Sequence, residues 1–197
     1  MAPGFHAPWF GGIQSVFLDR DGVLNRKARE GKYISTWAEF IPLAGVESAI
    51  ARLNASGRKV FVVTNQRGIA LGLYSEADVR ALHERFDQHL AAWGAHIDGW
   101  FFCPHDRPYD RSGCRCRKPL PGLFEQAFAA NPGTGPESSV MIGDSLSDIQ
   151  AGRALGMRTI FIDSGSKSSK PGGDQAMEFA DATCSSLAAA VDACLAG

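Results

Sequence analysis

Polar side chains able to act as nucleophiles, acids, bases or metal ligands stand at the ends of apolar runs in this sequence. Asp19, Thr64 and Asp144 each close a short apolar run. Asp21 lies two residues beyond Asp19, and Gly22 allows a sharp turn there. Carboxylates can attack electrophiles, transfer protons and bind hard cations, so this pattern predicts a catalytic site where these runs end. The alternative is that the two aspartates only stabilise a turn, a common use of aspartate in loops.

A second group of reactive side chains gathers in the loop 103–116. It consists of two pairs, Cys103 with His105 and Cys114 with Cys116. Three sulfurs and one imidazole suit tetrahedral zinc, and four protein ligands leave no open position for water. The pattern therefore predicts a structural zinc site. The alternative is a loop with three reduced thiols and no metal ion.

The elements that must position these side chains alternate along the chain. Five apolar, β-branched runs predict strands buried on both faces, at residues 15–18, 59–63, 99–102, 139–142 and 158–162. Amphipathic stretches predict helices at residues 46–53, 120–130, 146–155 and 187–195. This alternation predicts an α/β fold, a three-layer Rossmann-like parallel sheet with helices on both faces. Ligands bind at the carboxyl ends of such strands, so the strand-end side chains are expected to meet at one edge.

A further helix is expected to begin after Ser75, which can form a capping box with Asp78. Apolar residues then recur every three or four positions, as on a helix packed against a sheet: Val79, Leu82, Phe86, Leu90 and Trp93. His83 and His89 lie on the same helix and are expected at its surface. The stretch 163–174 is rich in serine, glycine and lysine and is expected to form a mobile loop.

Four short motifs, in this order, resemble those of the haloacid dehalogenase superfamily of phosphohydrolases. Residues 17–23 (FLDRDGV) resemble the first motif, 63–66 (VTNQ) the second, 117–119 (RKP) the third and 143–148 (GDSLSD) the fourth. One such motif alone is weak evidence, whereas four in order, each at its proper element, are specific. The resemblance implies a magnesium-dependent phosphatase that transfers a phosphoryl group to its own aspartate and then hydrolyses the acyl phosphate.

The resemblance also implies a role for each motif residue. Asp19 would be the nucleophile, and Asp21 would protonate the leaving oxygen and later deprotonate water. Magnesium would be bound by Asp19, by the main-chain carbonyl of Asp21 and by Asp144. Three further residues would support the phosphoryl group: Thr64 and Lys118 by binding its oxygens, and Asp148 by orienting either Lys118 or metal-bound water from behind.

The loop 103–116 narrows the resemblance to one group within the superfamily. The segments CPH and CRCRKP, together with DRDGVLN and VVTNQRGIA, resemble the D-glycero-D-manno-heptose 1,7-bisphosphate phosphatases, from about residue 15 to the end of the chain. This implies release of the 7-phosphate during synthesis of nucleotide-activated heptose for lipopolysaccharide or capsule. Substrate contacts would fall on Asn65, Gln66, Arg117 and Lys118. The sequence departs from that family at Ser145, where lysine is usual.

Two other functions agree with parts of this pattern. Histidinol-phosphate phosphatases share the fold and the zinc loop, although the TNQRG and CRCRKP segments favour the heptose enzymes. A non-catalytic module that binds sugar phosphates could use the same fold, but the presence of both Asp19 and Asp21 favours an enzyme. Residues 25–42 are too few for a folded cap domain. A capless site is therefore expected, with specificity set by short loops.

The composition is ordinary for a soluble globular protein. The chain has 197 residues, of which 45% are hydrophobic and 21% charged, and this predicts one domain over residues 1–197. The net charge of −1 argues against nucleic-acid and membrane-surface partners, and the partner implied by the resemblance is a small phosphorylated sugar. A monomer is expected. No apolar run reaches about 18 residues, and residues 1–12 do not resemble a signal peptide, so a cytoplasmic location is expected. Cys184 and Cys194 are expected to be buried.

Overall fold

The computed structural model of the chain describes residues 12–29, 31–106, 113–165 and 172–196. Within them, six parallel strands form one sheet in the order β3-β2-β1-β4-β5-β6. The strands are β1 (Ser15–Leu18), β2 (Lys59–Asn65), β3 (Gly99–Cys103), β4 (Ser139–Gly143), β5 (Arg158–Ile162) and β6 (Ala182–Cys184). All five predicted strands are present, and Thr64 lies inside β2 near its carboxyl end.

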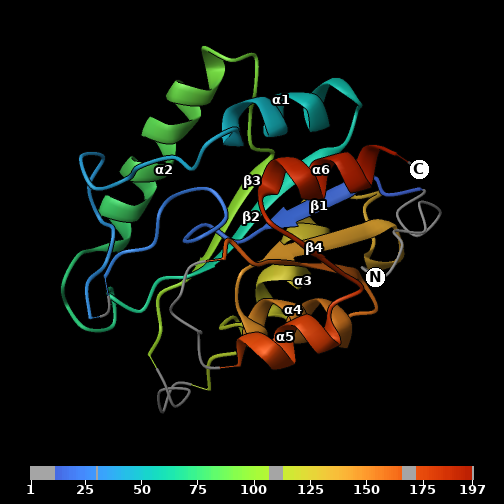
Figure 1. The fold of residues 1–197 in the computed structure, drawn as a ribbon. Helices are drawn as coiled ribbons and strands as arrows, with labels where there is room; N and C mark the ends of the chain where they lie inside the picture. Colours follow the sequence, from blue (N-terminus) through green and yellow to red (C-terminus); the bar gives the residue numbers. More distant parts are fainter. Residues whose placement is uncertain (1–11, 30, 107–112, 166–171, 197) are drawn as a thin grey trace.

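Helices cover both faces of the sheet, as Figure 1 shows. One face carries α1 (Val46–Ala55), α2 (Glu76–Ala91) and α6 (Leu187–Leu195). The other carries α3 (Gly122–Ala130), α4 (Leu146–Ala154) and α5 (Gly173–Phe179), and a short 3-10 turn (Pro136–Ser138) precedes β4. The expected three-layer α/β architecture is confirmed.

The central strand β1 is buried on both faces because its side chains alternate between two apolar layers. Val16 and Leu18 pack with α1, α2 and α6, whereas Phe17 points to the layer formed with α3 and α4. The Phe17 ring lies 5.0 Å from that of Phe61 on β2 and 5.3 Å from that of Phe124 on α3. Each such buried ring stabilises the fold by about 1.5–3 kcal/mol. This packing fixes the strand end from which Asp19 emerges.

Helix α2 begins as expected but differs from the prediction in two positions. The capping box between Ser75 and Asp78 is formed. Trp93, predicted to pack on the sheet, lies beyond the last residue of the helix and is 55% exposed, so the helical period no longer governs it. His83, predicted at the surface, is 3% exposed and stacks on Trp100 of β3, with ring centroids 4.0 Å apart.

Two short elements were missed from the sequence. Strand β6 has three residues and no β-branched run, and α5 begins at a glycine without a side-chain cap. Helix α5 replaces the end of the loop expected at 163–174, of which residues 166–171 lie outside the described part. Cys184 and Cys194 are buried, as expected.

The segment between β1 and α1 folds over the carboxyl edge of the sheet. Its described residues form turns and two isolated bridges, in which Asn25 pairs with Asp21 and with Pro42. Phe40 anchors it in the core against Phe86 of α2, with ring centroids 4.8 Å apart. The segment is therefore a flap rather than a cap domain. No helix in the described part of the chain is both long and apolar enough to cross a membrane.

Candidate active site

Asp19 is the first residue beyond β1 and is 8% exposed. Its backbone amide donates to the Ile142 carbonyl on β4 at 3.0 Å, which fixes it at the sheet edge. Lys118 Nζ lies 2.8 Å from Asp19 Oδ1. Burial opposes ionisation of Asp19, but the attraction of Lys118 and, less strongly, Lys27 outweighs it and lowers the pKa of this carboxyl. A carboxylate kept ionised in this way is available as a nucleophile.

Lys118 enters this cluster from the loop before α3. Its ammonium donates to the Val63 carbonyl at 2.6 Å and to Asp19, and it lies 2.6 Å from Asp148 Oδ1. Burial disfavours the charge of Lys118, but Asp148 and Asp19 together raise its pKa above the usual range. Lys118 is thus a fixed cation beneath the site, and three oxygens surround its three N–H groups.

Asp148 lies behind Lys118, on the first turn of α4. Asp148 is fully buried. Burial raises its pKa, and the negative charges of Asp19 and Asp144 add to this effect, which the attraction of Lys118 only partly offsets. Ser145 holds its other oxygen, Oδ2, through the backbone amide at 3.1 Å and the hydroxyl at 2.6 Å. Ser145 therefore acts here as the cap of α4 and orients Asp148.

Asp21 is held by three neighbouring side chains at the mouth of the site. Arg20 donates from Nη2 to both carboxylate oxygens at 3.2 and 3.0 Å, and Asn25 Nδ2 donates to Oδ1 at 3.0 Å. Gln66 Nε2 donates to Oδ2 at 3.1 Å. The side chain of Asp21 is 28% exposed, whereas that of Arg20 is 1% exposed. A carboxylate that is oriented from behind yet open to solvent suits exchange of protons with a substrate and with water.

Gln66 links Asp21 to the second motif. Its amide nitrogen also donates to Thr64 Oγ1 at 2.9 Å, and its amide oxygen accepts from the Tyr74 hydroxyl at 2.9 Å. Gln66 is 2% exposed. Every polar atom of this side chain therefore has a protein partner, and its contact with substrate stays a prediction.

Hydrogen bonds from Asn65 and from Arg117 hold the third motif in place. Asn65 Nδ2 donates to the Lys118 carbonyl at 3.1 Å, and its Oδ1 accepts from the Lys118 amide at 3.0 Å. Arg117 is 6% exposed and donates from Nη1 to the His105 carbonyl at 2.8 Å. These bonds hold Lys118 in place and connect it to the loop 103–116. Substrate contacts by Asn65 and Arg117 stay predictions.

Three carboxylates gather where the first and fourth motifs meet. One oxygen from each of Asp19, Asp144 and Asp148 lies within 4.8 Å of the others, and all three residues are buried. Gly22 is required beside them because its φ is +101° and a Cβ there would lie 1.9 Å from Asp144 Oδ2. Hard oxygen donors at this density suit Mg²⁺. The carbonyl of Asp21, the third predicted ligand, lies on the same turn.

The four predicted zinc ligands meet at the carboxyl end of β3. Four pairs of ligand atoms are in contact. His105 Nδ1 lies 3.5 Å from Cys103 Sγ and 3.4 Å from Cys116 Sγ, and Cys114 Sγ lies 3.6 Å from Cys103 Sγ and 3.3 Å from Cys116 Sγ. Tetrahedral zinc places neighbouring sulfur and nitrogen ligands roughly 3.5–3.8 Å apart. Burial raises the pKa of the Cys103 and Cys116 thiols, so ionising all three thiols needs a cation among them. The four residues could therefore hold a metal ion. Residues 107–112 of this loop lie outside the described part.

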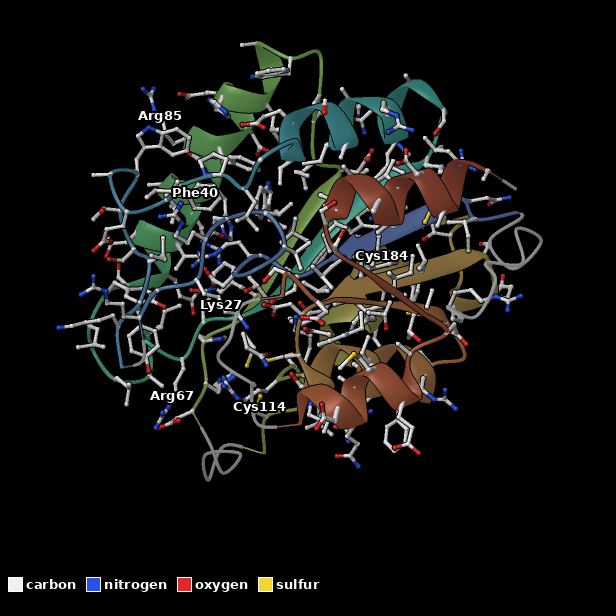
Figure 2. All side chains as sticks on the ribbon, viewed as in Figure 1. Lys27, Phe40, Arg67, Arg85, Cys114 and Cys184 are labelled. Atoms are coloured by element: carbon white, nitrogen blue, oxygen red, sulfur yellow. The ribbon has the colours of Figure 1, made fainter. Side chains whose placement is uncertain are left out.

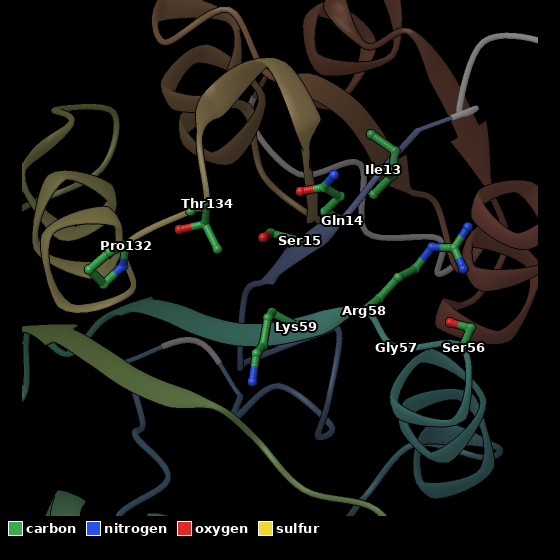
Figure 3. A pocket seen from close by; sticks show the side chains of 10 residues that line it. Ile13, Gln14, Ser15, Ser56, Gly57, Arg58, Lys59, Pro132 and Thr134 are labelled. Atoms are coloured by element: carbon green, nitrogen blue, oxygen red, sulfur yellow. The ribbon is translucent and has the colours of Figure 1, made fainter.

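A cavity of about 430 Å³ lies at the amino ends of β1 and β2, opposite the ends that carry Asp19 and Thr64. Figure 3 shows the side chains that line it. Ser15, Arg58, Lys59 and Thr134 are among the residues that line it. Ser15 begins β1 and Asp19 follows its end, so roughly 13 Å of strand separates the cavity from Asp19. The cavity is therefore separate from the group formed by Asp19, Asp144, Asp148 and Lys118, the candidate catalytic cluster.

Three residues that hold the site were not identified from the sequence: Arg20, Lys27 and Tyr74. Arg20 lies between the two aspartates of the first motif, and this position of a cation between two carboxylates could have identified it from the sequence. Lys27 Nζ lies 2.7 Å from Asp144 Oδ1. This contact depends on the path of the flap, and the contact of Tyr74 with Gln66 depends on the turn before α2, so neither had a local signal.

Comparison with known proteins agrees with this geometry. Residues 115–190 match the family model described as "HAD-hyrolase-like". The chain is 42% identical over 135 residues to D-glycero-alpha-D-manno-heptose-1,7-bisphosphate 7-phosphatase of Mycobacterium tuberculosis, covering 68% of this chain and 69% of the relative. It is 42% identical over 147 residues to D-glycero-beta-D-manno-heptose-1,7-bisphosphate 7-phosphatase of Rhodopseudomonas palustris, covering 73% and 79%.

A solved structure supports the same grouping. The D,D-heptose 1,7-bisphosphate phosphatase of B. bronchiseptica, complexed with magnesium and phosphate, superposes with a TM-score of 0.75 at 31% identity, covering 91% of this chain and 97% of the other. The fold and the catalytic cluster thus define a phosphoric monoester hydrolase of the haloacid dehalogenase type. Within that class, the chain belongs to the family of the D-glycero-D-manno-heptose-1,7-bisphosphate 7-phosphatases.

Proposed function

We propose that this chain hydrolyses the 7-phosphate of D-glycero-D-manno-heptose 1,7-bisphosphate by way of a phosphoryl group on Asp19. The observation that carries this proposal is the buried carboxylate of Asp19, kept ionised by Lys118 at the carboxyl end of β1. Asp21 lies beside it, oriented by Arg20 and open to solvent. The names of the curated relatives support the choice of substrate.

The reaction proposed for these residues has two steps. Asp19 attacks phosphorus while the bond to the sugar oxygen breaks, and Asp21 gives that oxygen a proton. Asp21 then takes a proton from water as the water attacks phosphorus, which releases inorganic phosphate and restores Asp19. Thr64 and Lys118 bind phosphoryl oxygens and stabilise the charge that develops on them.

The acidic cluster suits magnesium as the cofactor of this reaction. Asp19, Asp144 and the main-chain carbonyl of Asp21 would hold it, because all three offer the hard oxygen atoms that Mg²⁺ prefers. Bound magnesium would reduce the repulsion between the Asp19 carboxylate and the anionic phosphoryl group. Magnesium in the related B. bronchiseptica structure supports this assignment.

We also propose that Cys103, His105, Cys114 and Cys116 bind one structural zinc ion. Four protein ligands at contact distance fill a tetrahedral site, so no position is left for a reacting group. The site would fix the loop that carries Arg117 and Lys118, since Arg117 donates to the carbonyl of the ligand residue His105.

A cytoplasmic monomer acting as one domain is the proposed form of the enzyme. A metal site with three thiolate ligands is stable in a reducing compartment, where disulfides are rare. Cys103, Cys114 and Cys116 form no disulfide and are available as thiolate ligands.

The test of the substrate is magnesium-dependent release of phosphate from each anomer of the heptose bisphosphate, with histidinol phosphate assayed in parallel. Both anomers are needed because relatives named for each are 42% identical to this chain. The proposal requires rapid release from one anomer and slow release from histidinol phosphate. Release from histidinol phosphate alone would keep the phosphatase chemistry and contradict the heptose substrate.

A further inference from the structure

Lys27 brings a second cation to the catalytic cluster. It lies on the flap, and its Nζ is 2.7 Å from Asp144 Oδ1. Lys27 is labelled in Figure 2, where it lies beyond the ends of the central strands. Neither the motifs nor the proposed mechanism assigns it a function.

The backbone before Lys27 is fixed to the core. Asn25 is fully buried, and its side chain donates to Asp21 Oδ1 at 3.0 Å and to the Arg26 carbonyl at 2.9 Å. The Arg26 amide donates to the Ile41 carbonyl at 2.9 Å. The base of the flap is thus bonded to Asp21 on one side and to Ile41, near the end of the flap, on the other. The backbone from which the side chain of Lys27 extends is therefore fixed.

The side chain of Lys27 is also packed into place. Its Cε lies 2.9 Å from the position that a Cβ on Gly22 would take, on the same side as Asp144. A side chain at position 22 would displace both Lys27 and Asp144. The absence of a Cβ at Gly22 is therefore what lets the ammonium of Lys27 reach the cluster.

The charges of the cluster leave a role for this second cation. Lys118 and a bound Mg²⁺ would offset the negative charges of Asp19, Asp144 and Asp148, so the charge of an incoming phosphoryl group would be left without a partner. The side chain of Lys118 is 2% exposed and its ammonium lies within 2.8 Å of three protein oxygens, so a phosphoryl oxygen that binds Lys118 has to replace one of these contacts. The side chain of Lys27 is 40% exposed, so it lies at the open side of the cluster, where a substrate enters.

Contact with Asp144 does not prevent Lys27 from binding a further group. An ammonium has three N–H donors, and a carboxylate has two oxygens that can each accept. Asp144 can therefore hold Lys27 through Oδ1 and offer Oδ2 to a metal ion. We propose that Lys27 is a substrate-binding residue whose ammonium bridges Asp144 and an oxygen of the transferring phosphoryl group. This inference rests on the proposed phosphatase function.

The test measures binding of inorganic phosphate, the reaction product, by titration calorimetry in the presence of Mg²⁺. Lys27→Met should raise the dissociation constant of phosphate about tenfold, because one charge-assisted hydrogen bond is lost. Lys27→Arg, which keeps the charge, should bind phosphate more tightly than Lys27→Met. Lys32→Met removes the same charge from an exposed position on the flap and should bind like the wild type.

Two outcomes would overturn the role of Lys27. One is a Lys27→Met variant that binds phosphate as tightly as the wild type. The other is an equal loss in Lys32→Met, which would show an effect of overall charge. Failure of the proposed function is distinguishable, because then the wild type itself would release no phosphate from the heptose bisphosphate.

Discussion

At the scale of single residues, the catalytic carboxylates differ in their surroundings. Asp19 is buried against Lys118, and its pKa is lowered, so it is ionised before substrate binds. Asp21 is oriented by hydrogen bonds from Arg20, Asn25 and Gln66 but stays partly open to solvent. Two neighbouring aspartates are thus suited to different tasks, one as a nucleophile and the other as a carrier of protons.

Gln66 is expected to act as a positioning residue rather than through substrate binding. Its amide nitrogen holds Asp21 and Thr64 at once. Gln66→Leu should therefore lower kcat by about 10- to 100-fold with little change in KM. Steady-state kinetics would show this, and the same substitution at the exposed Gln88 of α2 should leave both constants unchanged.

The opposite kinetic pattern would support the substrate contact predicted from the sequence. A raised KM with an unchanged kcat would show that Gln66 contributes to binding and not to the orientation of Asp21. Tyr74→Phe gives an independent check, since it removes the hydroxyl that donates to Gln66 Oε1. It should lower kcat in the same direction and by less.

At the scale of elements, the loop 103–116 lies between β3 and the third motif and carries the four side chains proposed to bind zinc. Replacing both Cys114 and Cys116 by serine should release the zinc and lower the melting temperature by about 5 °C or more. Arg117 and Lys118 follow these ligands directly, so activity should fall as well. Elemental analysis and thermal denaturation would measure both effects.

The matched control for that variant replaces Cys184 and Cys194, which lie outside the cluster, by alanine. Its zinc content should equal that of the wild type, even if loss of buried sulfur lowers its stability. A Cys114→Ser/Cys116→Ser protein with the zinc content of the wild type would contradict the assignment of the ligands.

At the scale of the whole molecule, the sequence predicts the part of the fold that has a strong periodic or apolar pattern. Strands β1 to β5 have apolar runs, and α2 has a capping box before a regular stripe. Asp19 and Asp144 could be placed because each directly follows a strand, and parallel strands bring their carboxyl ends together. For this reason the sequence alone predicts that Asp19 and Asp144 meet.

The remaining features depend on contacts between segments far apart in the sequence. His83 is buried because Trp100 of β3 stacks on it, and nothing near position 83 indicates this. Lys27 reaches Asp144 because the flap folds back over β1. Strand β6 pairs at the sheet edge with three residues, too few to form a pattern. Short-range signals cannot predict such features, because their cause is the tertiary structure itself.

The central claim is that Asp19 carries the phosphoryl group during the reaction. Its most direct test is to quench the enzyme in acid during turnover of the heptose bisphosphate and to locate the phosphoryl group by peptide mass spectrometry. The account predicts a phosphoryl group on Asp19 in the wild type. It predicts none in Asp19→Asn, which should stay folded by circular dichroism and release no phosphate. A phosphoryl group on another residue, or turnover by Asp19→Asn at the rate of the wild type, would contradict the account.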